Sequence, residues 1–179
     1  MPLTNLMKPG LKLKNNPAPL LAFGAHPDDI EFGCGGVIAS ETQAGRKVHF
    51  VICSRGEAGT YGTPKQRTAE AKKAAAILGA TIEFIELDGD AHLEIRAAHA
   101  IKLAGILRRV RPGIVLAPSV VENQHPDHWR LGKLVRRRAT RSIRRFERTA
   151  PFTVAYHRPV IFLRRHTRSR ATRYFACAG

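Results

Sequence analysis

The sequence predicts an α/β fold with a mainly parallel sheet. Two observations support this. Four short apolar segments alternate with four longer segments of helical spacing, and each apolar segment ends in the glycine, proline or acidic residues that typically form loops. Buried strands separated by helices of this length build a parallel sheet, because each crossover returns the chain in the same direction. The expected architecture is therefore Rossmann-like, with helices on both faces of the sheet.

The first strand and the first helix flank a loop of polar and glycine residues. Leu20 to Ala25 is a continuous apolar run, which indicates a buried strand. His26 to Asp29 follows as a loop, and the glycines of residues 33–36 extend it. Val37 to Ala44 has helix-compatible spacing, so we expect the first helix there.

The ends of the second strand and the second helix are marked by clear sequence signals. Lys47 to Cys53 is apolar and is followed by the glycine-containing loop 54–59. Thr63-Pro64 supplies a cap and a first-turn proline, which predicts that a helix begins here. This helix should run to about Leu78, because Gly79 is a typical C-terminal stop.

The remaining segments repeat the alternation. Thr81 to Leu87 predicts a third strand, and Glu94 to Val110 predicts a helix that ends before Pro112. Gly113 to Ala117 predicts a fourth strand, and Asp127 to Phe146 a fourth helix. In an open parallel sheet the loops at the carboxyl ends of the strands converge on one crevice, where ligands bind. The candidate loops are 26–31, 54–61, 88–90 and 122–128.

The basic charge is concentrated at the end of the chain. The formal net charge is +16, but residues 1–129 hold 15 basic and 13 acidic side chains, whereas residues 130–179 hold 15 basic and one acidic. We therefore expect an N-terminal extension (1–18), one α/β domain (19–150) and a divergent basic segment (151–179). Within the basic segment, residues 152–156 and 160–163 predict two edge strands. The alternative is that a shifted reading frame in a GC-rich gene produced the arginine runs.

A basic arm can bind nucleic acid or an acidic partner. The arginines here recur all around the predicted helix, and few aromatic residues lie among them. A solvated helix face with a disordered end explains this arrangement better. We accordingly expect no specific nucleic-acid partner.

Composition also bears on the compartment. The longest apolar runs fall far short of the roughly 18 to 20 residues of a membrane helix, so no membrane association is expected. Residues 1–16 are polar and do not read as a secretory signal, which predicts a cytoplasmic protein. Cys34, Cys53 and Cys177 contain no C-x-x-C pair, so we expect no thiolate zinc site, and Cys34 and Cys53 should be small buried residues.

Two loops carry metal-ligand chemistry. His26-Pro27-Asp28-Asp29 follows the first strand, and His125-Pro126-Asp127-His128 follows the fourth. A catalytic zinc typically has three nitrogen or oxygen ligands and keeps one position open for water. His26 and Asp29 can face one point, and either histidine of the second loop completes the set. Asp28 could then take a proton from water, and the remaining histidine could return one to a leaving amine.

These two motifs, together with Glu31, the following glycines, Gly56-Glu57 and Arg67, resemble the PIG-L/LmbE-like family of N-acetylglucosaminyl deacetylases over roughly residues 20–139. The resemblance implies zinc, or alternatively ferrous iron, at a site whose residues have the following roles. The implied metal ligands are His26, Asp29 and His128. The implied catalytic residues are Asp28 as base, His125 as acid or transition-state stabiliser, and Asp127 orienting His125. The implied substrate contacts are Arg67, Asp90 (or Asp88) and Glu57. Asn123 stands where some members of the family have a tyrosine that aids the oxyanion, and its amide could donate a hydrogen bond there instead.

The resemblance further implies hydrolysis of an N-acetyl group on an N-acetylglucosamine-containing small molecule, releasing acetate and a free amine. The group attached to the sugar is left open, and a homo-oligomer is compatible with it. Two alternatives remain: a degenerate relative whose basic tail binds nucleic acid, and a metal amidase with a non-sugar substrate. A nucleotide-binding module is disfavoured, because the carboxylates of the first loop would repel a pyrophosphate.

Overall fold

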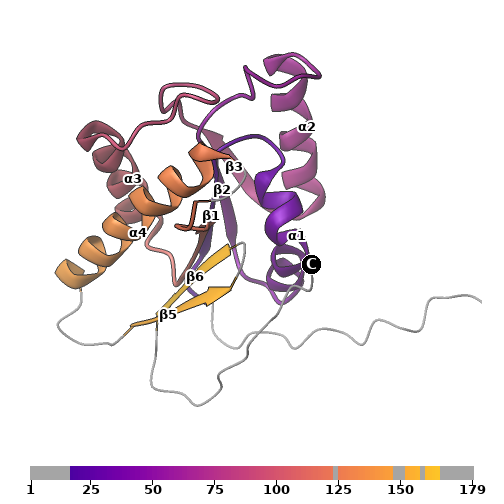
Figure 1. Ribbon diagram of the computed structural model, residues 1–179. Helices are drawn as coiled ribbons and strands as arrows, with labels where there is room; N and C mark the ends of the chain where they lie inside the picture. Colours follow the sequence, from indigo (N-terminus) through magenta and orange to yellow (C-terminus); the bar gives the residue numbers. More distant parts are fainter. Residues whose placement is uncertain (1–16, 123–124, 147–151, 158–159, 166–179) are drawn as a thin grey trace, which may run out of the picture.

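The structure is a computed structural model that describes residues 17–122, 125–146, 152–157 and 160–165, with side chains described up to Arg137. Its elements, shown in Figure 1, are β1 (Leu20–Gly24), α1 (Asp29–Gln43), β2 (Val48–Ile52), α2 (Pro64–Ile77), β3 (Thr81–Phe84), α3 (Ala97–Val110), β4 (Ile114–Pro118), α4 (Pro126–Phe146), β5 (Phe152–His157) and β6 (Val160–Arg165).

One mixed sheet runs through the molecule in the order β3-β2-β1-β4-β6-β5. β1 pairs in parallel with β2 and β4, and β2 pairs in parallel with β3. β6 is antiparallel to both β4 and β5. The predicted mainly parallel sheet is therefore confirmed. Of the two strands expected near the end of the chain, β5 lies at the edge, whereas β6 lies between β4 and β5.

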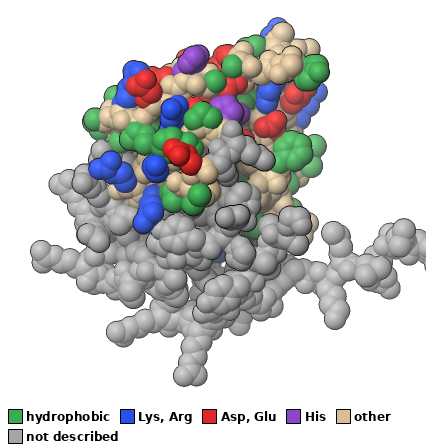
Figure 2. Space-filling view, in the orientation of Figure 1, with side chains coloured by type: hydrophobic (Ala, Val, Ile, Leu, Met, Phe, Trp, Pro, Cys, Tyr) green, Lys and Arg blue, Asp and Glu red, His purple; other side chains and the backbone are tan. Residues whose placement is uncertain are grey.

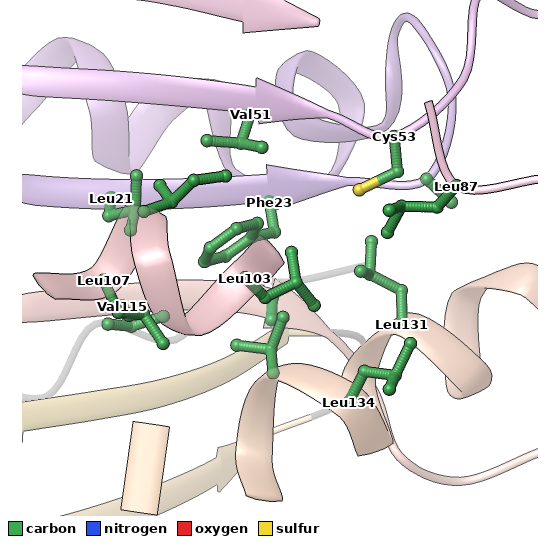
Figure 3. Packing of buried hydrophobic residues seen from close by; sticks show 14 of the residues in the cluster. Leu21, Phe23, Val51, Cys53, Leu87, Leu103, Leu107, Val115, Leu131 and Leu134 are labelled. Atoms are coloured by element: carbon green, nitrogen blue, oxygen red, sulfur yellow. The ribbon is translucent and has the colours of Figure 1, made fainter. Parts of the chain in front are cut away.

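Helices cover both faces of the sheet, as the sequence predicts. Figure 1 shows α1 and α2 on one side of the strands and α3 and α4 on the other. Alternate residues of β1 enter two separate cores: Leu21 and Phe23 pack toward α3 and α4 (Figure 3), whereas Leu20 and Ala22 pack toward α1. Burial of these apolar side chains is the main favourable term in folding.

The predicted burial of two cysteines is confirmed. Cys34 and Cys53 are both buried, and neither forms a disulfide. Cys53 belongs to the core that faces α3 and α4 (Figure 3), and burial raises the pKa of its thiol. Cys177 lies outside the described residues.

The first helix begins eight residues earlier than the sequence predicts. α1 starts at Asp29 and runs through the glycine-rich segment, with a kink at Cys34 (φ −154°, ψ 18°). Ile30, Cys34 and Ile38 are all buried, one turn apart on the same face of the helix. Packing of this stripe against the sheet outweighs the low helix propensity of glycine, which explains why the prediction from residue 37 is wrong.

Smaller boundary differences surround β3 and α3. β3 ends at Phe84 instead of Leu87, although Ile85 and Leu87 still donate backbone hydrogen bonds to β2 and the residue after it, Ile52 and Cys53. α3 starts three residues after Glu94, because the backbone N–H of Glu94 donates to the Asp88 carboxylate in the preceding loop.

The expected start of the second helix is confirmed. The Thr63 hydroxyl accepts from the Gln66 backbone N–H, and the Gln66 side chain accepts from the Thr63 N–H, which is a complete capping box.

The strand order creates a topological switch point between β1 and β4. After β1 the chain moves outward to β2 and β3, and it then crosses to the other side of β1 to form β4. Ligand crevices form outside the carboxyl ends of strands at such points. Gly132 brings α4 close to this place: a Cβ atom there would lie 2.7 Å from the Ser119 carbonyl oxygen. The loops after β1 and β4 are therefore the two that flank the crevice.

Two observations concern the surface. Figure 2 shows acidic and basic side chains interspersed on the described part of one face, without a large area of a single sign. No helix among the described residues is long and apolar enough to cross a membrane.

Candidate metal centre

The two loops at the switch point meet directly. The imidazole rings of His26 and His125 are 4.6 Å apart between centroids, and those of His26 and His128 are 5.3 Å apart. His26 follows β1, whereas His125 and His128 come from the loop and first turn that lead into α4. The fold thus brings three histidines together from segments about a hundred residues apart.

One potential metal-binding group consists of His26, Asp29 and His128. Each offers one ligand atom, and these atoms all lie within 4.8 Å of one another. Asp29 is fixed by its neighbours, since its Oδ2 accepts from the backbone N–H of Ala25 at 2.8 Å and of His26 at 2.9 Å. Its Oδ1 lies 3.0 Å from Nε2 of His128. Two imidazoles and one carboxylate suit zinc or ferrous iron, so this donor set fits the metal expected from the sequence.

A second potential group shares His26 but uses Asp90 and His125. Oδ1 of Asp90 lies 2.9 Å from Nε2 of His26, and Asp90 is only 8% exposed. Asp90 is expected from the sequence to contact substrate, and nothing in the sequence indicates that it also reaches the metal centre. The loop after β3 thus brings a second carboxylate to His26.

Burial and the neighbouring side chains act in opposite directions on the pKa values of His26 and Asp29. Burial lowers the pKa of His26, but the hydrogen bond and charge of Asp29, with contributions from Asp90 and Asp127, raise it above its ordinary value overall. Burial raises the pKa of Asp29, but hydrogen bonds to His128 and His26 outweigh this and hold it well below its usual range. The lowered pKa favours the carboxylate form of Asp29, which is the form that binds a cation.

Asp28 lies at the mouth of this site in an unusual backbone conformation. Its φ is +93°, in the region that non-glycine residues rarely adopt, and this turns the chain into α1. Its Oδ2 accepts a hydrogen bond from Nη2 of Arg67 at 3.1 Å. Burial raises the pKa of Asp28 above its ordinary value, although the charge of Arg67 opposes the rise.

Two glycines make room for Arg67. A Cβ atom at Gly56 would lie 2.6 Å from Nε of Arg67, and one at Gly59 would lie 2.5 Å from its Nη1. The guanidinium therefore passes directly along the backbone of the loop after β2. From there its Nη2 donates to the Pro27 carbonyl as well as to Asp28. A side chain at Gly56 or Gly59 would therefore collide with Arg67.

Glu57 lies in the same loop and is exposed. Its carboxylate accepts from the backbone N–H of Arg55 at 3.0 Å and of Asp90 at 3.2 Å. Asp90 in turn accepts from the backbone N–H of Ala58. Glu57 therefore links the loops after β2 and β3, a position the sequence does not predict. A direct contact between Glu57 and substrate stays a prediction.

Asp127 is 1% exposed, and its carboxylate approaches His26, with Oδ2 3.3 Å from Nε2. The bond to His125 comes instead from the Asp127 backbone N–H, which donates to Nδ1 of His125 at 3.3 Å. This leaves Nε2 as the position for a proton on a neutral His125. Asp127 thus contacts both histidines, with its backbone orienting His125 and its side chain facing His26.

Asp88 and Asp90, the two alternative substrate contacts expected from the sequence, lie in different places. Asp88 turns away from the centre and pairs with His99 and Arg96, each at 3.3 Å. Asp90 faces His26 instead. Asn123, the expected oxyanion contact, lies outside the described residues.

The part of the chain that is similar to known proteins includes both loops of the centre. The sequence matches the family described as PIG-L, GlcNAc-PI de-N-acetylase, over residues 21–139. The chain is 32% identical over 130 residues to the diacetylchitobiose deacetylase of Thermococcus kodakarensis, covering 67% of this chain and 48% of that protein. It is 34% identical over 120 residues to the 4-oxalmesaconate hydratase of Pseudomonas putida, covering 60% and 46%.

A solved structure gives a similar result. The N,N'-diacetylchitobiose deacetylase of Pyrococcus horikoshii, in complex with an inhibitor, superposes with a TM-score of 0.62 at 29% identity, covering 71% of this chain and 49% of that one. The chain therefore spans about half the length of the relatives it matches.

Proposed function

Because the chain belongs to the PIG-L, or GlcNAc-PI de-N-acetylase, family, we propose that it is a metal-dependent hydrolase that removes the N-acetyl group from an N-acetylglucosamine-containing molecule. The products are acetate and a free amine. The observation that supports this most directly is the convergence of His26, Asp29 and His128 beside the carboxyl of Asp28, whose pKa is raised.

His26, Asp29 and His128 would hold the metal, for which zinc and ferrous iron are both suitable. When bound, the metal supplies Lewis-acid polarisation of the acetamide carbonyl and lowers the pKa of water. The protein's own part is to fix three ligands in place. It does so through the two backbone N–H groups that hold Asp29 and through the contact of Asp29 with His128.

Asp28 is the proposed general base. Arg67 donates to its Oδ2, so Oδ1 is the oxygen that we assign to the attacking water. A carboxylate whose pKa is raised by burial is a better proton acceptor than an ordinary aspartate. Its proton acceptance lets a C–O bond form at the acetamide carbon.

His125 is the proposed stabiliser of the transition state. Its Nδ1 accepts from the Asp127 backbone, so Nε2 carries the proton of the neutral ring and can donate a hydrogen bond to the developing oxyanion. The proton that Asp28 takes from the water passes to the amide nitrogen as the C–N bond breaks, which releases the amine and restores the Asp28 carboxylate. Arg67 and Asp90 are the proposed contacts of the sugar hydroxyls, and Glu57 links the loop of Asp90 to the loop after β2.

A hydratase is the second candidate, because one relative of 34% identity is a 4-oxalmesaconate hydratase. By its name, the substrate of that enzyme is a carboxylate. Asp28, Glu31 and Glu70 line the cavity next to the site, and Arg67 is the basic residue of its lining. Carboxylates repel an anionic substrate, so this charge distribution favours the acetamido sugar.

The test is acetate release from the chain reconstituted with zinc or with ferrous iron under anaerobic conditions, using N-acetylglucosamine and its β-linked disaccharide. We expect release in the wild type and a loss of about 100-fold or more in kcat for Asp28→Asn, since general-base catalysis contributes on the order of 10² to 10⁴. The Asp28→Asn protein should keep its metal. Hydration of an unsaturated carboxylate without any acetate release would overturn the proposal in favour of the hydratase.

A further inference from the structure

Nε2 of His26 faces two buried carboxylates. Oδ1 of Asp90 lies 2.9 Å from it, and Oδ2 of Asp127 forms a hydrogen bond with it at 3.3 Å. An ionised carboxylate can only accept hydrogen bonds. Nε2 must therefore carry a hydrogen for the bond to Asp127 to form, and the lone pair of the neutral ring is then on Nδ1.

The other ring nitrogen faces a candidate metal ligand. Nδ1 of His26 lies 3.6 Å from Oδ2 of Asp29, whose Oδ1 contacts His128. A metal binds the imidazole nitrogen that has a free lone pair, and the hydrogen bond made by the second nitrogen decides which one that is. The contacts of Nε2 thus leave Nδ1 for the cation, on the side of the ring where Asp29 lies.

Both carboxylates are held in place by other contacts. Oδ2 of Asp90 accepts from the Ala58 backbone N–H at 3.2 Å. Nη1 of Arg130 lies 3.8 Å from Oδ1 of Asp127 and also donates to the Leu93 carbonyl at 3.1 Å. Arg130 therefore links α4, which carries Asp127, to the segment that follows Asp90. Movement of either carboxylate away from His26 would break these contacts.

Two carboxylates buried beside one imidazole need a compensating interaction. Oδ1 of Asp127 is buried and has no hydrogen-bond partner among the described residues, and such a group costs about 1 to 3 kcal/mol. When Nδ1 of His26 binds a cation, the ring loses electron density and its Nε2–H becomes a stronger donor. The two carboxylates therefore stabilise the metal-bound form of His26 more than the free form.

We propose that Asp90 and Asp127 are positioning residues for the metal. They hold the Nε2–H of His26, so that His26 binds the cation through Nδ1, and they increase metal affinity. The inference rests on the metal centre of the proposed function. It gives Asp90 a role besides its contact with the sugar, and it places the Asp127 side chain on His26, whereas the family resemblance implies His125.

Zinc affinity of the full chain, measured without substrate by competition with a chromogenic chelator, tests this role. Asp90→Asn and Asp127→Asn keep the size of each side chain but remove its charge. We expect each variant to bind zinc about 10- to 100-fold more weakly than the wild type, the usual effect of losing such a partner of a ligand. Glu94→Gln removes a charge from the loop that carries Asp90, at an exposed residue that pairs with Arg96, and it should leave zinc affinity unchanged.

The protonation of the His26 ring provides a measurement that needs no change to either carboxylate. Long-range proton–nitrogen NMR spectra of the assigned, zinc-loaded chain distinguish the two ring nitrogens. We expect a hydrogen on Nε2 and zinc on Nδ1. A hydrogen on Nδ1 would overturn the proposal, even if Asp90→Asn and Asp127→Asn failed to fold.

The outcomes separate this inference from the proposed function. Acetate release by the wild type, with unchanged zinc affinity in both variants, would overturn the positioning role and leave the deacetylase standing. Weaker zinc binding in both variants without acetate release by the wild type would support the role and overturn the deacetylase. Unchanged zinc affinity with a raised KM in Asp90→Asn would mean that Asp90 contacts the sugar alone. A folded wild type that binds no zinc would overturn both proposals.

Discussion

Oδ1 of Asp29 lies 3.0 Å from Nε2 of His128, so two candidate ligands from opposite sides of the switch point touch before any cation is considered. Asp29 is anchored to the backbone after β1, and His128 stands in the first turn of α4. The fold alone therefore places these two ligand atoms within 3.0 Å of each other. It also defines the residues whose removal should be most informative.

The first prediction concerns the metal content of the purified protein. The wild type should bind about one zinc or iron per chain, and His26→Ala and His128→Ala should each lose it, because either change removes one of three ligands. Elemental analysis of protein prepared without chelators measures this. His92→Ala is the matched control, since His92 is an exposed histidine of the loop that carries Asp90, and it should keep full metal content. Folded wild type that stays metal-free in added zinc would contradict the site.

Metal affinity should depend on pH through His26. The pKa of His26 is raised above 6.5, and a protonated imidazole cannot bind a cation, so affinity should fall as pH decreases from 8 toward 6. The metal-free protein should behave oppositely: the stability contributed by protonating His26 is present below about pH 6.5 and is lost as pH rises through its raised pKa. Urea unfolding of chelator-treated wild type and His26→Ala across this range tests the sign. An identical pH dependence in both would contradict it.

Gly59 should matter for catalysis more than for folding. Gly59→Ala places a Cβ atom 2.5 Å from the Arg67 guanidinium, which must shift away from Asp28. Misplacing a positioning group by about 1 Å can lower the rate by about 100-fold. We expect a fall of that order in kcat/KM for acetate release. Gly105→Ala, in α3 with open space around it, is the control and should retain the wild-type rate.

The core that faces α3 and α4 should dominate stability. Leu103 is fully buried among β1, β2 and α4 residues (Figure 3), so Leu103→Ala should cost about 2 to 5 kcal/mol of unfolding free energy. Ile101→Ala on the exposed face of the same helix should cost far less, since Ile101 is 66% exposed. Chemical denaturation measures both. Equal losses would mean that α3 is not packed as described.

The strand-end loops could be predicted from sequence because their signals are local. Apolar runs followed by histidine, proline and aspartate identify both halves of the centre, and alternation of strands and helices places them at one edge. Parallel pairing of β1 with β4 then brings them together. These steps need only the periodicity of the chain and the topology of parallel sheets.

Long-range packing accounts for what could not be predicted. The early start of α1 depends on the burial of Ile30 and Cys34 against the sheet, which the glycines of that segment conceal. Whether Asp88 or Asp90 faces the centre depends on backbone turns, with positive φ at Asp88, Gly89 and Ala91. The link from Glu57 to Asp90 joins two loops 33 residues apart and has no signature in the sequence.

The positive φ of Asp28 affects which substitutions at this position would stabilise the protein. A non-glycine residue at φ +93° is strained by about 1 to 3 kcal/mol, and glycine would relieve that strain. Asp28→Gly should therefore raise the melting temperature while abolishing acetate release. Selection for heat resistance alone would tend to discard the carboxylate, so its retention in any thermostable variant would be a record of selection for activity.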